Sequence, residues 1–456
     1  MENFSESDVR AVLNKVLALS KADECGASLD GDHNGNLRFA RNAVSTSGGD
    51  DRHTLSVQCS YGKKVGTATV NEFDDASLEK VVRRAEELAK LAPENPEFVS
   101  ELGPQKYDQP PGFFDSTAAI GPDFRAQAAA ASILPCRQEK LVAAGFLQHN
   151  HGFNARANSK GLYGYVRSSD VDFSVTIRTE DGKGSGYGVA DLNDAAKLDT
   201  AAVSRVAMDK AVRSRETRAI EPGKYTVILE PAASVDLISH MVRQMDARLA
   251  DEGRSFLTKA GGGNRLGEKL MDERVNIYSD PLNAEAPGDA WAPDGRPRRR
   301  VDWVKDGAVA NLAYSRYWAQ KKGVAEDKAV PGLGRGFGGR AVGAFEGAQG
   351  YIMAGGTDSL DALVKSVKRG VLVTRMWYIR EVDPQTVLYT GLTRDGTFYV
   401  ENGEIKYAIK NFRFNESPVI MLNNIEALGK PVRMNGSLVP PMVVRDFTFS
   451  SLSDAV

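Results

Sequence analysis

The segments EKVVRRAEELAK at residues 79–90 and VSRVAMDKAVRS at residues 203–214 decide the predicted fold of this chain. In each segment two alanines lie four residues apart, which places them on one face of an amphipathic helix. Alternating strand patterns precede both helices, over residues 54–70 and 171–189. The sequence therefore predicts a strand-strand-strand-helix unit that occurs twice.

The two copies also begin alike, with NLRFARN at residues 36–42 and NARAN at residues 154–158. Between them, residues 104–122 are rich in Pro, Gly and Asp and are predicted to form a long loop, which an alanine-rich helix over residues 124–134 follows. These features predict an N-terminal α/β domain with an internal repeat over residues 1–220.

The pattern of the sequence changes from the repeated unit to predicted hairpins after the Pro-Gly pair that follows the second repeat helix. Residues 301–309 and 398–407 each predict a β-hairpin, because Asp306-Gly307 and Asn402-Gly403 supply the positive φ angles of a primed turn. We expect residues 221–456 to form a β-rich, mostly antiparallel C-terminal domain with two or three helices. The whole chain is then an α+β protein.

Composition excludes several functions. The 456 residues contain 58 Lys and Arg against 60 Asp and Glu, a net charge of −2, which is not the basic footprint of a nucleic-acid-binding protein. No segment approaches the roughly 18 consecutive apolar residues that a membrane-spanning helix needs. The first residues are acidic and lack a secretory signal, so we expect a cytoplasmic protein.

Cys25, Cys59 and Cys136 are too few and too widely spaced for a disulfide framework or a cysteine-rich zinc site, and we expect reduced structural thiols.

The segment from Ser234 to Glu252 has apolar residues at helical spacing, directly after a predicted strand. A strand, a turn and a helix in this order could position a metal-binding pair. The candidate ligands on the helix are His240, Glu252, Asp236, Asp246 and Asp251. No His-Glu-x-x-His motif occurs in the chain, so an amphipathic core helix with a partly exposed histidine is favoured.

His149 and His151 are spaced so that a strand would place both side chains on one face. They could chelate a metal with His33 as a third ligand. A polar pair at a strand edge or in a loop is favoured over this metal site.

A glycine-rich stretch formally contains the pattern GxGxxG at Gly334, Gly336 and Gly339. The dinucleotide fingerprint needs a strand before it and a helix after it, and neither is predicted here. We therefore expect a mobile loop over a groove. A basic run before the first hairpin could hold an anionic substrate or be a solvated loop, and it comprises Arg296, Arg298, Arg299 and Arg300.

The order of several motifs along nearly the whole chain resembles the TldD/PmbA family, whose founding pair, TldD/TldE, forms a heterodimeric zinc metalloprotease. In the N-terminal half the resemblance rests on residues 37–42 and on NSKG at residues 158–161, which is similar to the family's Asn-Ser-x-Gly turn. In the C-terminal half it rests on residues 225–231, 294–297, 303–307 and 400–405.

The resemblance implies a place for the family's catalytic motif. The catalytic member carries His-Glu-x-x-x-His on the helix that follows the strand equivalent to residues 225–231, and a cysteine near the C-terminus as a further zinc ligand. This pattern aligns Ser239 with the first histidine, His240 with the glutamate and Gln244 with the second histidine. Residues 429–442 contain no cysteine. The zinc ligands and the general base are therefore absent.

A shift of one residue does not restore the motif, because Met241 and Met245 then take the second and third positions. The resemblance thus implies a metal-free subunit of the TldE (PmbA) type, with no catalytic residue and no cofactor of its own. Zinc is expected in a TldD-like catalytic partner, and the heterodimer is expected to cleave peptides or unfolded segments. The alternatives are a homodimeric member with a rebuilt, metal-free site and a peptide-binding module without catalysis. Neither nucleic acid nor membrane is an expected partner.

A β-rich groove in such a subunit can take an extended peptide as an added strand. The glycine-rich loop of residues 332–347 is expected to border this groove, near the helix that carries Ser239 to Gln244. Its groove-lining candidates are Arg335, Gly336, Gly338 and Arg340.

Overall fold

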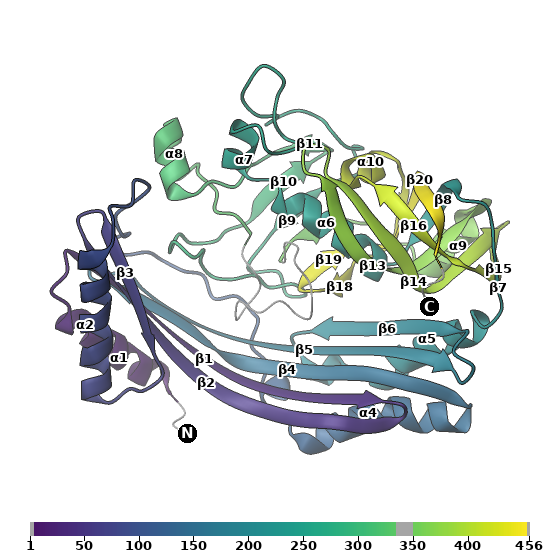
Figure 1. Ribbon diagram of the computed structural model, residues 1–456, viewed down its shortest axis with the longest axis horizontal. Coiled ribbons are helices and arrows are strands. Elements are labelled where there is room, and N and C mark those ends of the chain that lie inside the picture. The colour runs from purple at the N-terminus through teal and green to yellow at the C-terminus, as the bar shows by residue number, and fades with distance from the viewer. Residues whose placement is uncertain (1–3, 334–349, 454–456) are drawn as a thin grey trace.

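The computed structural model describes residues 4–333 and 350–453 of the chain (Figure 1). Helices lie between runs of strands that form mostly antiparallel sheets, and the predicted α+β class is confirmed. A long curved sheet and its helices come from the N-terminal half, and two further sheets come from the C-terminal half.

The N-terminal half forms a six-stranded sheet with the order β3-β2-β1-β4-β5-β6. The bounds of its elements are, in chain order, α1 (Glu6–Leu19), β1 (Glu24–Ala40), β2 (Ala43–Tyr61), β3 (Lys64–Val70), α2 (Asp75–Leu91), α3 (Asp115–Ala118), α4 (Pro122–Gln138), β4 (Leu141–Asn158), β5 (Tyr163–Thr179), β6 (Ser185–Leu192), the 3-10 helix η1 (Ala195–Lys197) and α5 (Thr200–Arg213). The predicted unit is present twice, as β1, β2, β3 and α2 and again as β4, β5, β6 and α5.

The strands are longer than the sequence predicts. Residues 36–42 and 154–158, expected at the start of each copy, lie at the ends of β1 and β4. β1 already begins at Glu24, although its middle is a polar and glycine-rich run. Continuous antiparallel pairing with β2 and β4 satisfies the backbone there, so the strand persists without the apolar alternation that would reveal it.

The two faces of the long sheet differ in chemistry. Odd-numbered residues of β1, such as Leu29 and Phe39, are buried under the helices, with α1 and α2 at one end of the sheet and α4 and α5 at the other (Figure 1). Even-numbered residues on the opposite face include Asp30 and Asp32, and this face is turned toward the C-terminal half. Cysteines 25 and 59 lie opposite each other under the helices and, like Cys136, are buried and unoxidised.

The C-terminal half contributes a six-stranded sheet, β11-β10-β9-β12-β19-β18, and an eight-stranded sheet, β13-β8-β20-β16-β14-β15-β7, with β17 paired to β20. The bounds are β7 (Thr217–Arg218), β8 (Gly223–Leu229), α6 (Pro231–Arg243), α7 (Ala247–Asp251), β9 (Ile277–Ser279), β10 (Val301–Lys305), β11 (Ala308–Val309), α8 (Arg316–Lys322), β12 (Ile352–Met353), α9 (Leu360–Ser366), β13 (Arg369–Asp383), β14 (Leu388–Glu401), β15 (Glu404–Ile409), β16 (Asn411–Glu416), α10 (Pro418–Asn423), β17 (Ile425–Leu428), β18 (Val432–Met434), β19 (Ser437–Val439) and β20 (Met442–Ser453). An additional pairing of β13 with β14 closes five strands of the larger sheet into a ring.

Helix α6 lies in the main core of this half. Its residues Ile238 and Met241 are fully buried in one cluster with Ile277 from the smaller sheet and Val371 from the larger one. A helix that is apolar toward two sheets is held on both sides, so its register relative to the strands is strongly specified.

Both predicted hairpins are present. β10 and β11 are joined at Asp306-Gly307, whose φ angles are 49° and 75°. β14 and β15 are joined at Asn402-Gly403, with φ angles of 53° and 77°. Positive φ at both central positions is the geometry that Asp-Gly and Asn-Gly favour in two-residue turns.

The single helix expected from Ser234 to Glu252 is wrong. The structure has α6 and then α7, separated by three residues. The backbone N–H groups of Gln244 and Met245 bond the carbonyls of Met241 and Val242, which tightens the last turn of α6. The chain then forms a bridge with Ala313, and the Asp246 side chain caps α7. Tertiary pairing therefore overrides the helical periodicity.

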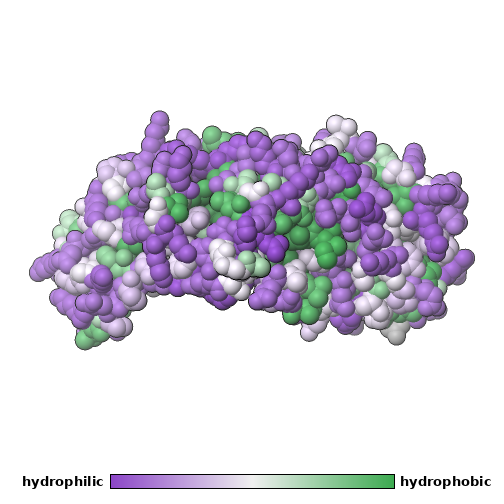
Figure 2. Space-filling model, turned by 90° about the horizontal axis from the view of Figure 1, so that it is seen from above, coloured by the Kyte–Doolittle hydropathy of each residue, from purple (hydrophilic) through white to green (hydrophobic). Residues whose placement is uncertain are grey.

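The surface seen from above is mostly hydrophilic, with hydrophobic residues grouped near the middle of that face (Figure 2). Among the described helices, none is both long and apolar enough to cross a membrane.

Candidate functional site

A cavity lies beside α6, on the side of the helix that faces β13, and we call it the α6 cavity. Asp236 and His240 are one helical turn apart, and both line it. Other lining residues come from β6, β13 and the β18–β19 turn, and include Tyr187, Val189, Arg375, Trp377, Tyr378, Met434 and Asn435. The exposed fractions of Trp377 and Tyr378 are 44% and 58%, which leaves two aromatic rings open to a ligand or a partner.

Asp236 lines the α6 cavity, and its pKa is strongly shifted from the ordinary value. Burial raises the pKa of Asp236 to about 7, and the nearby Arg375 offsets only part of that rise. Arg375 is already paired, because its Nε donates to Oδ2 of the buried Asp395 at 2.6 Å. The guanidinium also lies 3.9 Å from the ring centre of Tyr187. Asp236 therefore faces a neutralised cation and exchanges its proton near neutral pH.

Ser239, aligned with the first histidine of the family motif, points into the core. It is fully buried, and its Oγ lies 2.9 Å from the Tyr351 hydroxyl. That hydroxyl in turn donates to the carbonyl of Val235 at 3.1 Å. Ser239 therefore stabilises the packing of α6 and does not reach the α6 cavity.

The other two motif positions point elsewhere. The His240 ring stacks on Tyr389, with 4.8 Å between ring centres. Gln244, the C-terminal cap of α6, donates to Oε2 of Glu381 at 2.9 Å. The structure thus directs the three aligned side chains to three different environments and does not bring them together.

These residues do not fit a zinc ion. Zinc sites use imidazole, thiolate and carboxylate ligands in tetrahedral geometry, whereas Ser239 and Gln244 offer a hydroxyl and an amide that are already hydrogen-bonded. In residues 4–333 and 350–453, no group of three or more His, Cys, Asp or Glu side chains could hold a metal ion.

The three histidines singled out in the sequence do come together. His33 on β1 pairs with His151 on β4, and the ring centre of His33 lies 4.6 Å from that of His151 and 6.3 Å from that of His149. The expected strand edge or loop is wrong, because β4 is an interior strand. Arg125 lies 3.0 Å from Nε2 of His149, and burial and this guanidinium lower the pKa of His149 to about 4. A cation beside the ring disfavours a metal ion there.

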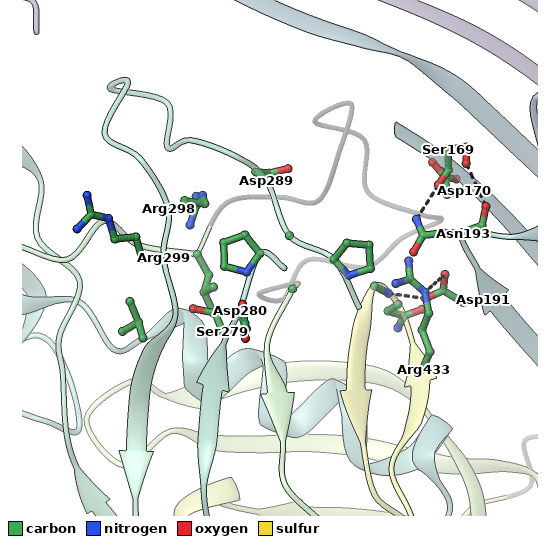
Figure 3. Close-up of a pocket in the computed structure, with 18 of the residues that line it drawn as sticks. Ser169, Asp170, Asp191, Asn193, Ser279, Asp280, Asp289, Arg298, Arg299 and Arg433 are labelled. Atoms are coloured by element: carbon green, nitrogen blue, oxygen red, sulfur yellow. Dashed lines mark hydrogen bonds and ion pairs between the residues drawn. The ribbon is translucent and has the colours of Figure 1, made fainter. Parts of the chain in front are cut away.

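A second cavity, which we call the inter-sheet cavity, separates the long sheet from the smaller C-terminal sheet (Figure 3). One wall comes from β5, β6 and the residues after β6, and carries Asp170, Asp172, Asp191 and Asn193. The opposite wall comes from the segments around β9 and β10, and carries Ser279, Asp280, Asp289, Arg298 and Arg299. Arg433 on β18 joins the walls, because its Nε donates to Oδ1 of Asp191 at 3.1 Å.

The first wall is a buried acidic surface. Asp170 accepts a hydrogen bond from Asn150, yet burial raises its pKa to about 6, and Asp191 adds to the rise. Burial, together with the charges of Asp191 and Asp170, raises the pKa of Asp172 well above its ordinary value. Asp191 is the one of these three aspartates that is paired with an arginine among the described residues.

The basic run has two buried members, so the expected alternative of a solvated loop is wrong for them. Arg296 is 6% exposed and bonds Asp294 and the carbonyl of Tyr314. Arg298 is 8% exposed, and its Nε donates to the carbonyl of Trp291 at 3.2 Å. Its Nη2 is buried and has no hydrogen-bond partner within residues 4–333 and 350–453.

The two cavities meet at the β18–β19 turn. Asn435 lines both, and Asn435 and Gly436 form this turn with φ angles of 51° and 73°. The predicted loop residues Arg335, Gly336, Gly338 and Arg340, together with the glycines of the GxGxxG pattern, lie outside the described residues. Leu333 and Gly350, the described residues on either side of this segment, line the inter-sheet cavity.

The sequence analysis missed the acidic wall. Its signal is the run Asp170-Val171-Asp172-Phe173, in which carboxylates alternate with buried apolar residues. In a strand this alternation places both aspartates on the face opposite the core. The pairing of Asp191 with Arg433, 242 residues apart, has no local signal.

These features define an α+β class of protein in which a duplicated sheet faces a β-rich half, with one cavity at their junction and another beside the helix that follows β8. Three sequence models of the PmbA/TldA metallopeptidase match the chain: domain 1 at residues 32–89, the central domain at residues 122–215 and the C-terminal domain at residues 222–451. The chain belongs to the PmbA/TldD metallopeptidase family.

Named relatives agree with this assignment. Metalloprotease PmbA from Escherichia coli O157:H7 is 21% identical over 403 residues, which cover 84% of this chain and 82% of the relative. The crystal structure of TldE from Thermococcus kodakarensis has a TM-score of 0.83 at 18% identity and covers 98% of this chain and 99% of its own. A Thermotoga maritima protein described as a candidate modulator of a DNA gyrase has a TM-score of 0.82 at 17% identity, over 97% of this chain and all of its own. At these identities the solved structures show a shared fold.

Proposed function

We propose that this chain is the non-metal-binding, TldE-like subunit of a two-subunit metalloprotease that cleaves peptides or unfolded segments. One observation carries the proposal. The helix that bears the zinc motif in catalytic members of the family has Ser239 sealed in the core by Tyr351, and Gln244 held by Glu381. Neither side chain is available as a ligand, so the zinc and the general base belong to a TldD-like partner.

The contribution of this chain is to hold the peptide. β6 and β18 are edge strands of two different sheets, and they flank the inter-sheet cavity. An extended peptide can add to such an edge through backbone hydrogen bonds, which give affinity without a strong sequence demand. The inter-sheet and α6 cavities then offer adjoining places for its side chains.

Co-expression with a family member that carries His-Glu-x-x-x-His tests the proposal. We expect a stable complex that contains zinc and cleaves an unfolded peptide, while this chain alone neither binds stoichiometric zinc nor cleaves. A complex whose partner lacks the motif glutamate is the matched control and should be inactive. Cleavage by this chain alone in the presence of a chelator would contradict the subunit role.

The Asp236–His240 pair supports a second candidate, a homodimer with a rebuilt, metal-free site. A carboxyl group that titrates near pH 7 beside an imidazole on the same helix face can serve as an acid or base. Asp236→Asn separates the two candidates. The substitution should abolish chelator-resistant cleavage in a metal-free site and should leave zinc-dependent cleavage by the two-subunit complex in place. Peptide binding without cleavage in either assay would identify a binding module.

A further inference from the structure

We propose that the inter-sheet cavity binds a peptide segment that carries one carboxylate and one cationic side chain, with the carboxylate on Arg298 and the cation on Asp172. This inference rests on the proposed function only in taking the ligand to be a peptide. It assigns the substrate chemistry, which neither the fold nor the family relationship specifies.

Arg298 is the first part of the argument. Its side chain is more than nine-tenths buried, and its described hydrogen bonds are limited to a neutral acceptor, the carbonyl of Trp291. Within the described part of the chain it forms no ion pair, and Nη2 has no partner. A buried guanidinium is costly unless an anion joins it, so the residue is prepared for a carboxylate. Asp289 and Asp294 lie near enough to act on Arg298 through their charges, but among the described residues neither forms an ion pair with its guanidinium, and Nη2 stays without a partner.

Asp172 is the second part. It lines the opposite wall, and Oδ2 is buried with no hydrogen-bond partner among the described residues. Asn193, which also lines this wall, has a buried Oδ1 that no other described residue contacts by a hydrogen bond. Arg433 lies near enough to lower the pKa of Asp172 through its charge, but its guanidinium forms its ion pair with Asp191. This wall therefore presents unused acceptors, where a ligand ammonium or N–H group can donate.

The two walls together select the ligand. An isolated anion would satisfy Arg298 but would leave the acidic wall unpaired, and an isolated cation would leave Arg298 unpaired. A peptide with both charges satisfies both walls, and its backbone N–H groups suit Asn193.

Calorimetric titration of the isolated chain with N-acetylated alanine tetrapeptides tests the proposal. The first peptide has one internal lysine and a free C-terminal carboxylate. The second peptide is the C-terminal amide of the first. The third has glutamine in place of the lysine and keeps the free carboxylate. The fourth is the second peptide with one internal alanine replaced by aspartate. We expect the first peptide to bind about tenfold more tightly than the second and the third. Recovery of affinity by the fourth would identify a side-chain carboxylate as the natural source, and no recovery would identify the chain terminus.

Single substitutions in the two walls test which residue binds the carboxylate of the peptide and which binds its lysine. Arg298→Gln should abolish the preference for the acid over the amide and keep the preference for lysine, whereas Asp172→Asn should do the reverse. Arg300→Gln removes the same charge from an exposed neighbour that does not line the cavity, and it should change each affinity by less than about twofold. Thermal unfolding reports whether each variant is folded, and Arg298→Met, which also removes the charge, replaces Arg298→Gln if the latter is not.

Equal binding of all four peptides by the wild-type chain, or no binding, would overturn the inference. This outcome is distinct from failure of the proposed function, because the titration needs neither zinc nor a partner. A complex that cleaves peptides while the isolated chain shows no preference refutes only the cavity assignment.

Discussion

Ser239 and Tyr351 are hydrogen-bonded to each other inside the core, with 2.9 Å between their oxygens. Because Tyr351 donates to Val235, Ser239 is the donor of this pair and the α6 backbone completes the network. The position aligned with a zinc-binding histidine is thereby part of the packing of α6. Both side chains are fully buried, so no space remains there for an imidazole that must also reach a metal.

Removing the Tyr351 hydroxyl should destabilise the fold. Tyr351→Phe leaves Ser239 and the Val235 carbonyl without their partner, and we expect a loss of about 1–2 kcal/mol in the free energy of unfolding. Ser239→Ala should cost less, because Tyr351 keeps the carbonyl. Urea denaturation of the double variant should show a cost smaller than the sum of the two, and strictly additive costs would contradict the network.

The purified chain should contain well under one zinc ion per chain, because the residues at the motif positions are poor ligands and already hydrogen-bonded. Elemental analysis measures this directly, and a chelator should leave the melting temperature unchanged. Stoichiometric zinc that a chelator removes would show that the ligands lie elsewhere. His33, His149 and His151 would be the first residues to replace.

The ionisation of Asp236 should make stability depend on pH. Its folded-state pKa of about 7 is above the ordinary value of 3.8, so its favourable contribution is complete below pH 4 and is lost as the pH rises through 7. Asp236→Asn should therefore be more stable than wild type at pH 8.5, by roughly 2–4 kcal/mol, with little difference at pH 4. Urea denaturation at the two pH values measures this.

The control for this experiment is Asp327→Asn, which removes a side chain that is 75% exposed. Its effect on the free energy of unfolding should stay within about 0.5 kcal/mol at both pH values. A pH-independent effect of Asp236→Asn would show that Arg375 holds the carboxylate ionised, contrary to its engagement by Asp395.

The chain should assemble as a dimer or a heterodimer. Edge strands and the open rings of Trp377 and Tyr378 leave surface that a partner can cover. Light scattering at micromolar concentration, with and without a His-Glu-x-x-x-His homologue, should report a mass of two chains. A monomer that binds no homologue would argue against the subunit role.

The sequence by itself determined the local and repeated parts of this fold. Asp306-Gly307 and Asn402-Gly403 specify their hairpins because positive φ angles are a property of the turn residues alone. The twofold unit was readable because its helices at residues 79–90 and 203–214 bury alanines at the same spacing. The residue types at the positions that the resemblance aligns with the zinc-binding histidines, Ser239 and Gln244, were also given by the sequence, and the absence of zinc stays a prediction.

Tertiary structure alone decided the sites. Asp191 meets Arg433 across 242 residues, and Arg298 is buried although its neighbour Arg299 is exposed. The break between α6 and α7 comes from pairing with Ala313, against the helical pattern of the segment itself. Burial, pKa values and cavities depend on which distant segments pack together, and that information is a property of the assembled sheets, which no local run of residues contains.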